Sequence, residues 1–181
     1  MYKYKLKFTR LQSDIFRLLC IKAGKPLNQR EIAGLLNVSP AGIGNAIKDL
    51  VNNDLVRVDK NNKINLSLVE LNRRNSIVMG LKRVENLKMI YESGFAGFFE
   101  KNFPGCLVIL FGSYSFGEDT VESDVDIAVF GSEPKNLDLR NFEKNFEREI
   151  NVNYYKDLKN VNKNLKSNIL NGITLQGFVE L

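Results

Sequence analysis

Two carboxylates and a glycine-serine pair form the most informative pattern in the sequence. Gly112-Ser113 follows an apolar run, and Asp124 and Asp126 follow after ten intervening residues. Alternation along a strand places the side chains of residues i and i+2 on one face, so the two carboxylates can share a hard cation such as Mg²⁺. A glycine-serine turn offers backbone N–H groups and a hydroxyl to phosphates. The pattern therefore indicates a site for a nucleoside triphosphate with magnesium.

The composition narrows the chemistry that this site can perform. The chain has 181 residues, of which 44% are hydrophobic and 26% are charged, as is typical of a folded globular protein with one sizeable domain or two small ones. It contains no histidine. That excludes Ser-His-Asp and Cys-His catalysis and any His-ligated zinc site. General-base work must fall to carboxylates, Lys, Tyr or water.

The cysteines and the hydropathy pattern bear on the compartment. Cys20 and Cys106 lie in apolar surroundings without CxxC spacing, which predicts buried free thiols in a reducing compartment. The apolar run 106–111 is far shorter than the roughly 20 residues that span a bilayer, and no signal-peptide pattern opens the chain. We expect a cytoplasmic protein with no membrane partner.

The net charge of +5 is unevenly distributed. Residues 1–67 carry 12 Lys/Arg against 5 Asp/Glu, whereas residues 68–181 carry 14 against 16. A basic module is therefore joined to a slightly acidic one, and a basic module favours a polyanionic partner such as nucleic acid.

The first third of the chain predicts three helices and a hairpin. Asn28 and Glu31 form the pattern of a capping box, and Ser39-Pro40 is a second helix start with proline at its first position. The expected elements are a strand over 1–8, helices over 13–22, from 28 and over 39–52, and strands over 55–58 and 63–66.

This order resembles the winged helix-turn-helix domain over 1–67, with 39–52 as the recognition helix. The resemblance implies duplex DNA as a partner. The residues expected to contact DNA are Asn45 and Lys48 on the outward helix face and Arg57, Lys60 and Lys63 on the wing. The alternative is a dimerisation module, which would make the protein a homodimer, or a protein-docking module.

A helical connector is expected over 68–103. Its first helix should run from Leu68 to Tyr91 and bury a stripe on one face, with Lys82 among the charged residues elsewhere on the helix. The expected stripe is Ile77, Leu81, Val84, Leu87 and Tyr91. A second, aromatic-rich helix should cover 93–103, and the domain boundary should fall within this connector.

The remaining chain, 104–181, predicts a mixed sheet flanked by helices, which makes the fold class α+β. The expected strands cover 107–111, 124–130, 149–154 and 174–179, the last at an edge, and the expected helical segments cover 113–116 and 157–170.

Gly112-Ser113, ten residues and Asp124-Val125-Asp126 resemble the signature of the DNA polymerase beta superfamily of nucleotidyltransferases. The short length and the ending 168–175 resemble its minimal nucleotidyltransferase branch. The resemblance implies that Gly112, Ser113 and Gly117 bind the triphosphate. It also implies that Asp124 and Asp126 are the catalytic residues and hold two magnesium ions.

Two positions depart from the family pattern. Phe116 stands where an Arg is usual before the glycine of the loop. Asn151, between Ile150 and Val152, stands where a third carboxylate is usual, and Glu149 shares its face under strict alternation. The third metal-binding position therefore falls on Asn151 or Glu149, and loss of the acid would weaken or abolish catalysis.

The resemblance implies a Mg²⁺-dependent nucleotidyltransferase that moves an NMP, with AMP favoured, from a nucleoside triphosphate to a hydroxyl acceptor. In the minimal branch the acceptor is often a partner toxin, which would make this chain the antitoxin of a toxin-antitoxin pair. The alternative is a non-catalytic, DNA-binding transcriptional regulator whose second domain binds only a nucleotide or a partner.

Overall fold

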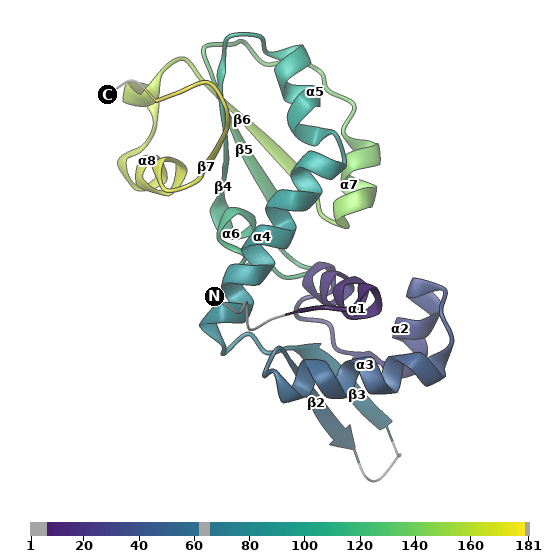
Figure 1. The fold of residues 1–181 in the computed structure, drawn as a ribbon. Helices are drawn as coiled ribbons and strands as arrows, with labels where there is room; N and C mark the ends of the chain where they lie inside the picture. Colours follow the sequence, from purple (N-terminus) through teal and green to yellow (C-terminus); the bar gives the residue numbers. More distant parts are fainter. Residues whose placement is uncertain (1–6, 62–65, 180–181) are drawn as a thin grey trace, which may run out of the picture. The chain divides into compact units, whose positions relative to one another are not determined.

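The computed structural model describes residues 7–61 and 66–179, which form two compact units (Figure 1). The first unit extends to Met79 and the second begins at Gly80, so the boundary lies inside helix α4. The elements of the first unit are α1 (Arg10–Ile21), β1 (Leu27–Asn28), α2 (Gln29–Leu36), α3 (Pro40–Asn52), β2 (Val56–Asn61) and β3 (Leu66–Leu71).

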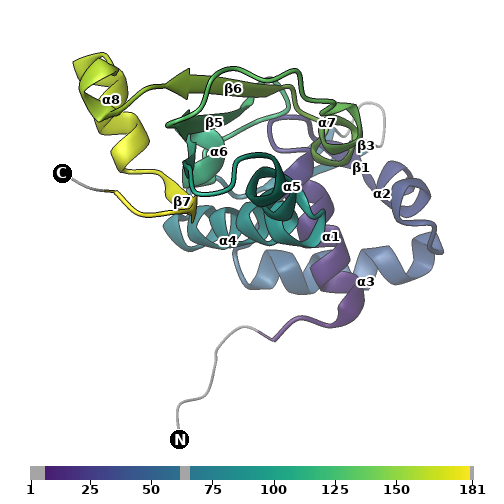
Figure 2. The same cartoon turned by 90° about the horizontal axis from the view of Figure 1, so that it is seen from above.

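The first unit is a winged helix. A short turn joins α2 to α3, with Asn37 in the left-handed conformation at a φ of 53°. The three strands form an antiparallel sheet in the order β1-β3-β2, and β2 and β3 are the two strands of the wing. Figure 2 shows α1 crossing α3. The predicted fold of this unit is confirmed.

Local capping explains where its helices begin. The Asn28 side chain accepts hydrogen bonds from the backbone N–H groups of Arg30 and Glu31, while the Glu31 carboxylate accepts one from the backbone of Asn28, as the capping box predicts. Thr9 and Gln12 form a second capping box, so α1 begins three residues earlier than expected. Ser39 precedes α3 but makes no side-chain capping bond.

The predicted hairpin was displaced by a few residues. The second strand runs over Leu66–Leu71 rather than 63–66, so the segment from Leu68 is not the start of a helix. Cross-strand pairing explains the difference, because Val69 and Leu71 are buried opposite Val58 and Val56. The expected strand over 1–8 falls almost entirely outside the described residues.

The second unit contains a four-stranded mixed sheet, which confirms the α+β fold. The strand order is β6-β5-β4-β7, in which β4 pairs antiparallel with β5 and β7, and β5 pairs parallel with β6. The elements are α4 (Ser76–Glu92, shared with the first unit), α5 (Phe95–Asn102), β4 (Leu107–Phe111), α6 (Gly112–Phe116), β5 (Val125–Phe130), α7 (Arg140–Phe146), β6 (Ile150–Tyr155), the 3-10 turn η1 (Leu158–Asn160), α8 (Lys163–Leu170) and β7 (Ile173–Gln176).

Helices cover both faces of this sheet, with α5 and α7 on one side and α8 on the other (Figure 1). The alternation of β4 divides its side chains between two cores. Val108 and Leu110 pack with the aromatic residues of α5, whereas Ile109 and Phe111 pack with Ile169 of α8. The sheet is therefore fixed from both sides, and the loops at its ends are available for a site.

Helix α4 differs most from its prediction. Ile77, Val84 and Tyr91, which were expected in the core, are 60%, 61% and 55% exposed. The buried positions are instead Val78, Lys82, Asn86 and Ile90, which repeat every four residues. A lysine and an asparagine thus occupy the inward face, and their polar partners are described below.

Cys20 is buried and Cys106 is half-buried, and neither forms a disulfide. The expectation of a fully buried thiol was therefore wrong for Cys106. Among the described residues, no helix is long and apolar enough to cross a membrane.

Candidate active site

The two aspartates lie at the start of the central strand β5. Asp124 immediately precedes the strand, and Asp126 is its second residue. Both side chains are half-buried, between the hydrophobic strand interior and the solvent. In the sheet register, Asp126 is opposite Phe111 of β4 on one side and Asn151 of β6 on the other. The sheet therefore brings the end of β4, with its Gly-Ser pair, and the start of β6 to the two carboxylates.

Gly112 makes room for the Asp126 carboxylate. Its φ is 73°, a left-handed conformation that favours glycine, and a Cβ atom there would lie 2.5 Å from Oδ2 of Asp126. Ser113 follows within α6 and is half-buried. Gly117, also left-handed at 75°, ends α6 and donates its N–H to the Tyr114 carbonyl at 3.3 Å. The loop geometry thus depends on glycine at both ends of the short helix.

Asn151 reaches the carboxylates directly. Its side-chain amide Nδ2 donates to Oδ2 of Asp124 at 3.0 Å. Glu149 is exposed, and its backbone carbonyl accepts from the N–H of Val125 at 2.8 Å. Of the two candidates for the third position, Asn151 is therefore the one whose side chain contacts the aspartates.

The donor set fits magnesium, although with less charge than three acids would give. Within the described ranges no group of three or more His, Cys, Asp or Glu side chains is placed to hold a metal. Two carboxylates and an amide oxygen are nevertheless hard ligands of the kind that Mg²⁺ takes. Asn151 presents its NH₂ group to Asp124, so its side-chain amide must rotate before its oxygen can face a cation.

The environment favours the protonated form of one aspartate. Burial raises the pKa of Asp126 above its ordinary value of 3.8, and the nearby charge of Asp124 raises it further, whereas a hydrogen bond from Asn151 lowers it. Burial, followed by the charge of Asp126, also raises the pKa of the Tyr155 hydroxyl. The two carboxylates repel each other at the end of the strand, and a bound cation would relieve this repulsion.

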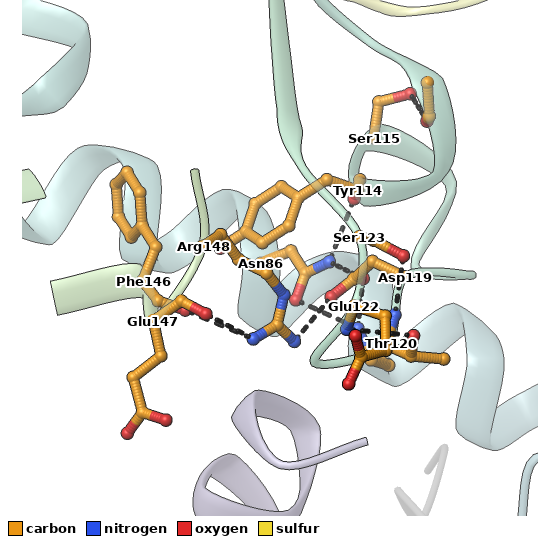
Figure 3. A network of polar contacts seen from close by, with 12 residues as sticks. Asn86, Tyr114, Ser115, Asp119, Thr120, Glu122, Ser123, Phe146, Glu147 and Arg148 are labelled. Carbon is orange, nitrogen blue, oxygen red and sulfur yellow. Dashed lines mark hydrogen bonds and ion pairs between the residues drawn. The ribbon is translucent and has the colours of Figure 1, made fainter. Parts of the chain in front are cut away.

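A buried polar network stands behind this site (Figure 3). Asp119 forms ion pairs with Lys82 of α4 and, at 3.1 Å, with Arg148, and all three side chains are at most 1% exposed. Asn86 donates to Asp119 at 2.7 Å and to the Tyr114 carbonyl at 2.9 Å. Buried charges are stable only when paired in this way. The network fixes α4 to the loop that follows α6.

The same loop continues to Asp124. The Thr120 N–H donates to Oγ of Ser123 at 3.0 Å, and the Ser123 N–H donates to the Thr120 carbonyl at 3.0 Å (Figure 3). This reciprocal pair closes a turn between Asp119 and Asp124. The buried ion pairs and the turn therefore set the position of Asp124, and neither was predicted from the sequence.

Arg83 places a positive charge near Phe116, the loop position where the family pattern usually has an arginine. The guanidinium carbon of Arg83, on α4, lies 5.8 Å from the centroid of the Phe116 ring. This is cation–π distance, so a positive charge is held beside the Gly112–Gly117 loop by a residue from another element.

An acidic cavity of about 540 Å³ adjoins Asp124. It is lined by Val121, Glu122, Ser123, Asp124, Glu143, Glu147, Arg148 and Glu149. Glu149 and Asp124 thus line the same cavity, even though Asn151 makes the direct hydrogen bond to Asp124. The cavity offers space next to Asp124 and a surplus of negative charge.

The predicted DNA-binding residues lie on the first unit. Asn45, Lys48 and Arg57 are exposed on α3 and β2, as expected for an outward face. Lys60 belongs to β2, and Lys63 falls outside the described residues. The described part of this surface therefore presents two cations and an amide.

The comparisons with known proteins agree with this description of the second unit. Residues 96–179, a little under half of the chain, match the family model "Polymerase beta, Nucleotidyltransferase", so this part of the chain is similar to nucleotidyltransferases of the polymerase beta type. The matched range contains the Gly-Ser pair, both aspartates and Asn151. Among curated proteins there is no match to the chain.

Solved structures with partial similarity are bacterial regulators. A mutant of Lactococcus lactis ZitR matches with 18% identity and a TM-score of 0.43, over 57% of this chain and 67% of that one. The Streptococcus pyogenes adhesin competence repressor AdcR matches with 22% identity and a TM-score of 0.44, over 56% and 70%. Wild-type ZitR in complex with DNA matches with 22% identity and a TM-score of 0.40, over 55% and 68%.

Proposed function

We propose that the second unit binds a nucleoside triphosphate with Mg²⁺ and transfers a nucleotidyl group to a hydroxyl acceptor. The observation that carries this proposal is the approach of Gly112 to Asp126, beside Asp124, inside the nucleotidyltransferase-family domain. A Cβ atom at residue 112 would displace the Asp126 carboxylate and strain a left-handed backbone, so glycine keeps the Gly-Ser turn open directly beside the carboxylates. That is the arrangement needed by a polyphosphate that shares its metal with the protein.

Each residue then has a definite task. Asp124 and Asp126 would hold the magnesium, which would neutralise charge on the triphosphate and on the departing pyrophosphate. The Ser113 hydroxyl would donate to a phosphate oxygen, and Gly117 would keep the loop in shape. Arg83, held over Phe116, would supply a further positive charge near the phosphates.

The acidic cavity is the proposed binding site of the acceptor. It contains Asp124 among its lining residues and is large enough for a small molecule or one extended protein segment. In the transfer, the acceptor oxygen bonds to the α-phosphorus and the bond to pyrophosphate breaks. The hydroxyl proton passes to a site carboxylate or to water, since the chain has no histidine. AMP as the transferred group and a partner toxin as the acceptor follow from the resemblance to the minimal branch.

A second candidate function is favoured by one observation. Asn151 replaces a negative charge with an amide that donates to Asp124, which weakens the case for a fully active two-metal site. Under this alternative the second unit binds nucleotide or a partner without transferring a group. The winged helix then makes the chain a DNA-binding regulator that responds to that ligand.

In either case we propose that the first unit binds duplex DNA. Its winged-helix topology and the surplus of Lys/Arg over residues 1–67 support this proposal. Because α3 presents only one lysine, Lys48, on its described outward face, phosphate contacts should contribute more than base contacts.

Transfer of a label from ATP radiolabelled at the α-phosphate tests the enzymatic proposal. The full-length chain is incubated with Mg²⁺, labelled ATP and a hydroxyl-containing acceptor, including the co-expressed product of the neighbouring gene. Asp126→Asn should abolish transfer, while Asp138→Asn, an exposed aspartate paired with Arg140, should leave it unchanged. Metal-dependent ATP binding without transfer to any acceptor would favour the non-catalytic alternative.

A further inference from the structure

A second cavity, also of about 540 Å³, lies at the other end of the sheet. It is lined by Gly105, Leu107, Phe130, Gly131, Lys156, Asp157, Leu158, Lys159, Lys166, Gly177 and Phe178. Phe130 is the last residue of β5, four residues after Asp126, and at a rise of ~3.3 Å per residue this corresponds to about 13 Å along the strand. The cavity is thus distinct from the aspartate site.

The charge at this cavity is opposite to that beside Asp124. Lys156, Lys159 and Lys166 line it, and in the part of the chain that the structure describes none of their ammonium groups forms an ion pair. The single acid, Asp157, accepts hydrogen bonds from the backbone N–H groups of Lys159 at 2.7 Å and Asn160 at 3.1 Å. Its carboxylate therefore caps η1 but keeps its charge, so the lining carries three cations against one anion.

An aromatic ring completes the cavity. Phe178 is 75% exposed although it is fully apolar, and it lies beside the lysines at the end of the chain segment that follows β7. Gly177 has a φ of 74°, and a Cβ atom there would lie 3.0 Å from both the Cys106 carbonyl oxygen and the Leu107 Cα atom. The glycine therefore lets the segment fold closely over β4 and places Phe178 at the rim.

We propose that this cavity binds a nucleotide as a second ligand site, with its phosphates on the three lysines and its base against Phe178. Ammonium groups bind phosphate as point charges, and an exposed aromatic ring stacks on the planar face of any base. A volume of about 540 Å³ suits a mononucleotide, whereas a single-stranded nucleic acid would need a groove that tracks its backbone. The site needs no metal, which distinguishes it from the aspartate site.

Metal-free calorimetry on the full-length chain tests this inference. ATP is titrated in excess EDTA into an Asp124→Asn/Asp126→Asn double variant, which removes the proposed metal site. One metal-independent binding event is expected. Lys159→Gln combined with Lys166→Gln should weaken it at least about tenfold, because hydrogen bonds to charged groups are strong. Lys101→Gln combined with Lys144→Gln, two lysines outside the cavity, should leave it unchanged.

A second variant separates the base from the phosphates. Phe178→Ala should weaken ATP binding about fivefold or more but should not change binding of inorganic tripolyphosphate. The inference is overturned if ATP does not bind without metal, or if the cavity lysine variants bind it as the parent does. It is also overturned if a single-stranded oligonucleotide binds at these lysines much more tightly than ATP does. Far-UV circular dichroism verifies that each variant is folded.

Discussion

Replacing Asp119 with asparagine should destabilise the second unit by about 3–5 kcal/mol, because it removes the buried anion that is paired with both Lys82 and Arg148. The Lys82 side chain is 0% exposed, and those of Asp119 and Arg148 are each 1% exposed. With Asp119 ionised, the three groups carry a net charge of +1. The asparagine variant removes the carboxylate that is ion-paired with both buried cations, although Arg148 retains a hydrogen bond to the Glu147 carbonyl at 3.0 Å.

Lys82→Met provides the comparison that makes this prediction specific. It removes one cation, keeps an unbranched side chain of similar size, and leaves Asp119 and Arg148 as a neutral pair. We therefore expect a loss of less than about 1 kcal/mol, since replacing buried charges with apolar groups is often close to neutral. Glu100→Gln on the exposed face of α5 is the matched carboxylate-to-amide control and should change stability by less than about 0.5 kcal/mol.

Urea unfolding followed by far-UV circular dichroism measures these differences, since the chain contains no tryptophan. The expected order of stability is parent, then Lys82→Met, then Asp119→Asn. If Lys82→Met were as destabilising as Asp119→Asn, the charge argument would be refuted and simple packing of α4 would explain both losses. A loss below about 1 kcal/mol for Asp119→Asn would refute it as well.

Three further predictions concern the aspartate site and the proposed DNA-binding surface. Asn151→Asp should raise Mg²⁺ affinity by at least about tenfold in calorimetry, because it adds a charge at ligand distance, whereas Asn153→Asp, further along the same strand face, should have a smaller effect. Because the folded-state pKa of Asp126 is raised, Mg²⁺ affinity measured against pH should begin to fall on acidification at a pH above the ordinary carboxyl pKa of 3.8. In the metal-free protein, this group favours folding at low pH, and its contribution is lost as the pH rises through its raised pKa. Asp126→Asn should remove both effects. Lys48→Gln should lower the log-log salt slope of DNA binding by about one unit without changing sequence preference, and Lys25→Gln should not; an unchanged slope would place the DNA contacts elsewhere.

The residues that the sequence could reveal are those fixed by local geometry. The spacing of Gly112-Ser113 and the two aspartates requires only a strand, a turn and the next strand, and each of these follows from short-range patterns. The capping box at Asn28 and Glu31 is similarly local. Asn151 was also found, because it stands between Ile150 and Val152 at the position where the family pattern has a third carboxylate.

The residues that sequence reasoning missed depend on contacts between distant segments. Lys82 was expected outside the core because a lysine is buried only with a partner, and its partner Asp119 is 37 residues away. The available signal was the spacing of Val78, Lys82, Asn86 and Ile90, which repeats every four residues on the buried face. Hydrophobicity alone favoured the wrong stripe, because it assigned Ile77 to the core, where it is 60% exposed.

The most direct test of the central claim is calorimetry of ATP binding to the full-length chain and to its Asp124→Asn and Asp138→Asn variants. Each protein is measured with Mg²⁺ and with EDTA. The account predicts a magnesium-dependent binding event that Asp124→Asn abolishes and Asp138→Asn preserves, above any metal-independent binding at the lysine cavity. A magnesium-dependent event that is unchanged in the Asp124→Asn variant, or the absence of any such event in the parent, would contradict the assignment of this strand end as the nucleotide site.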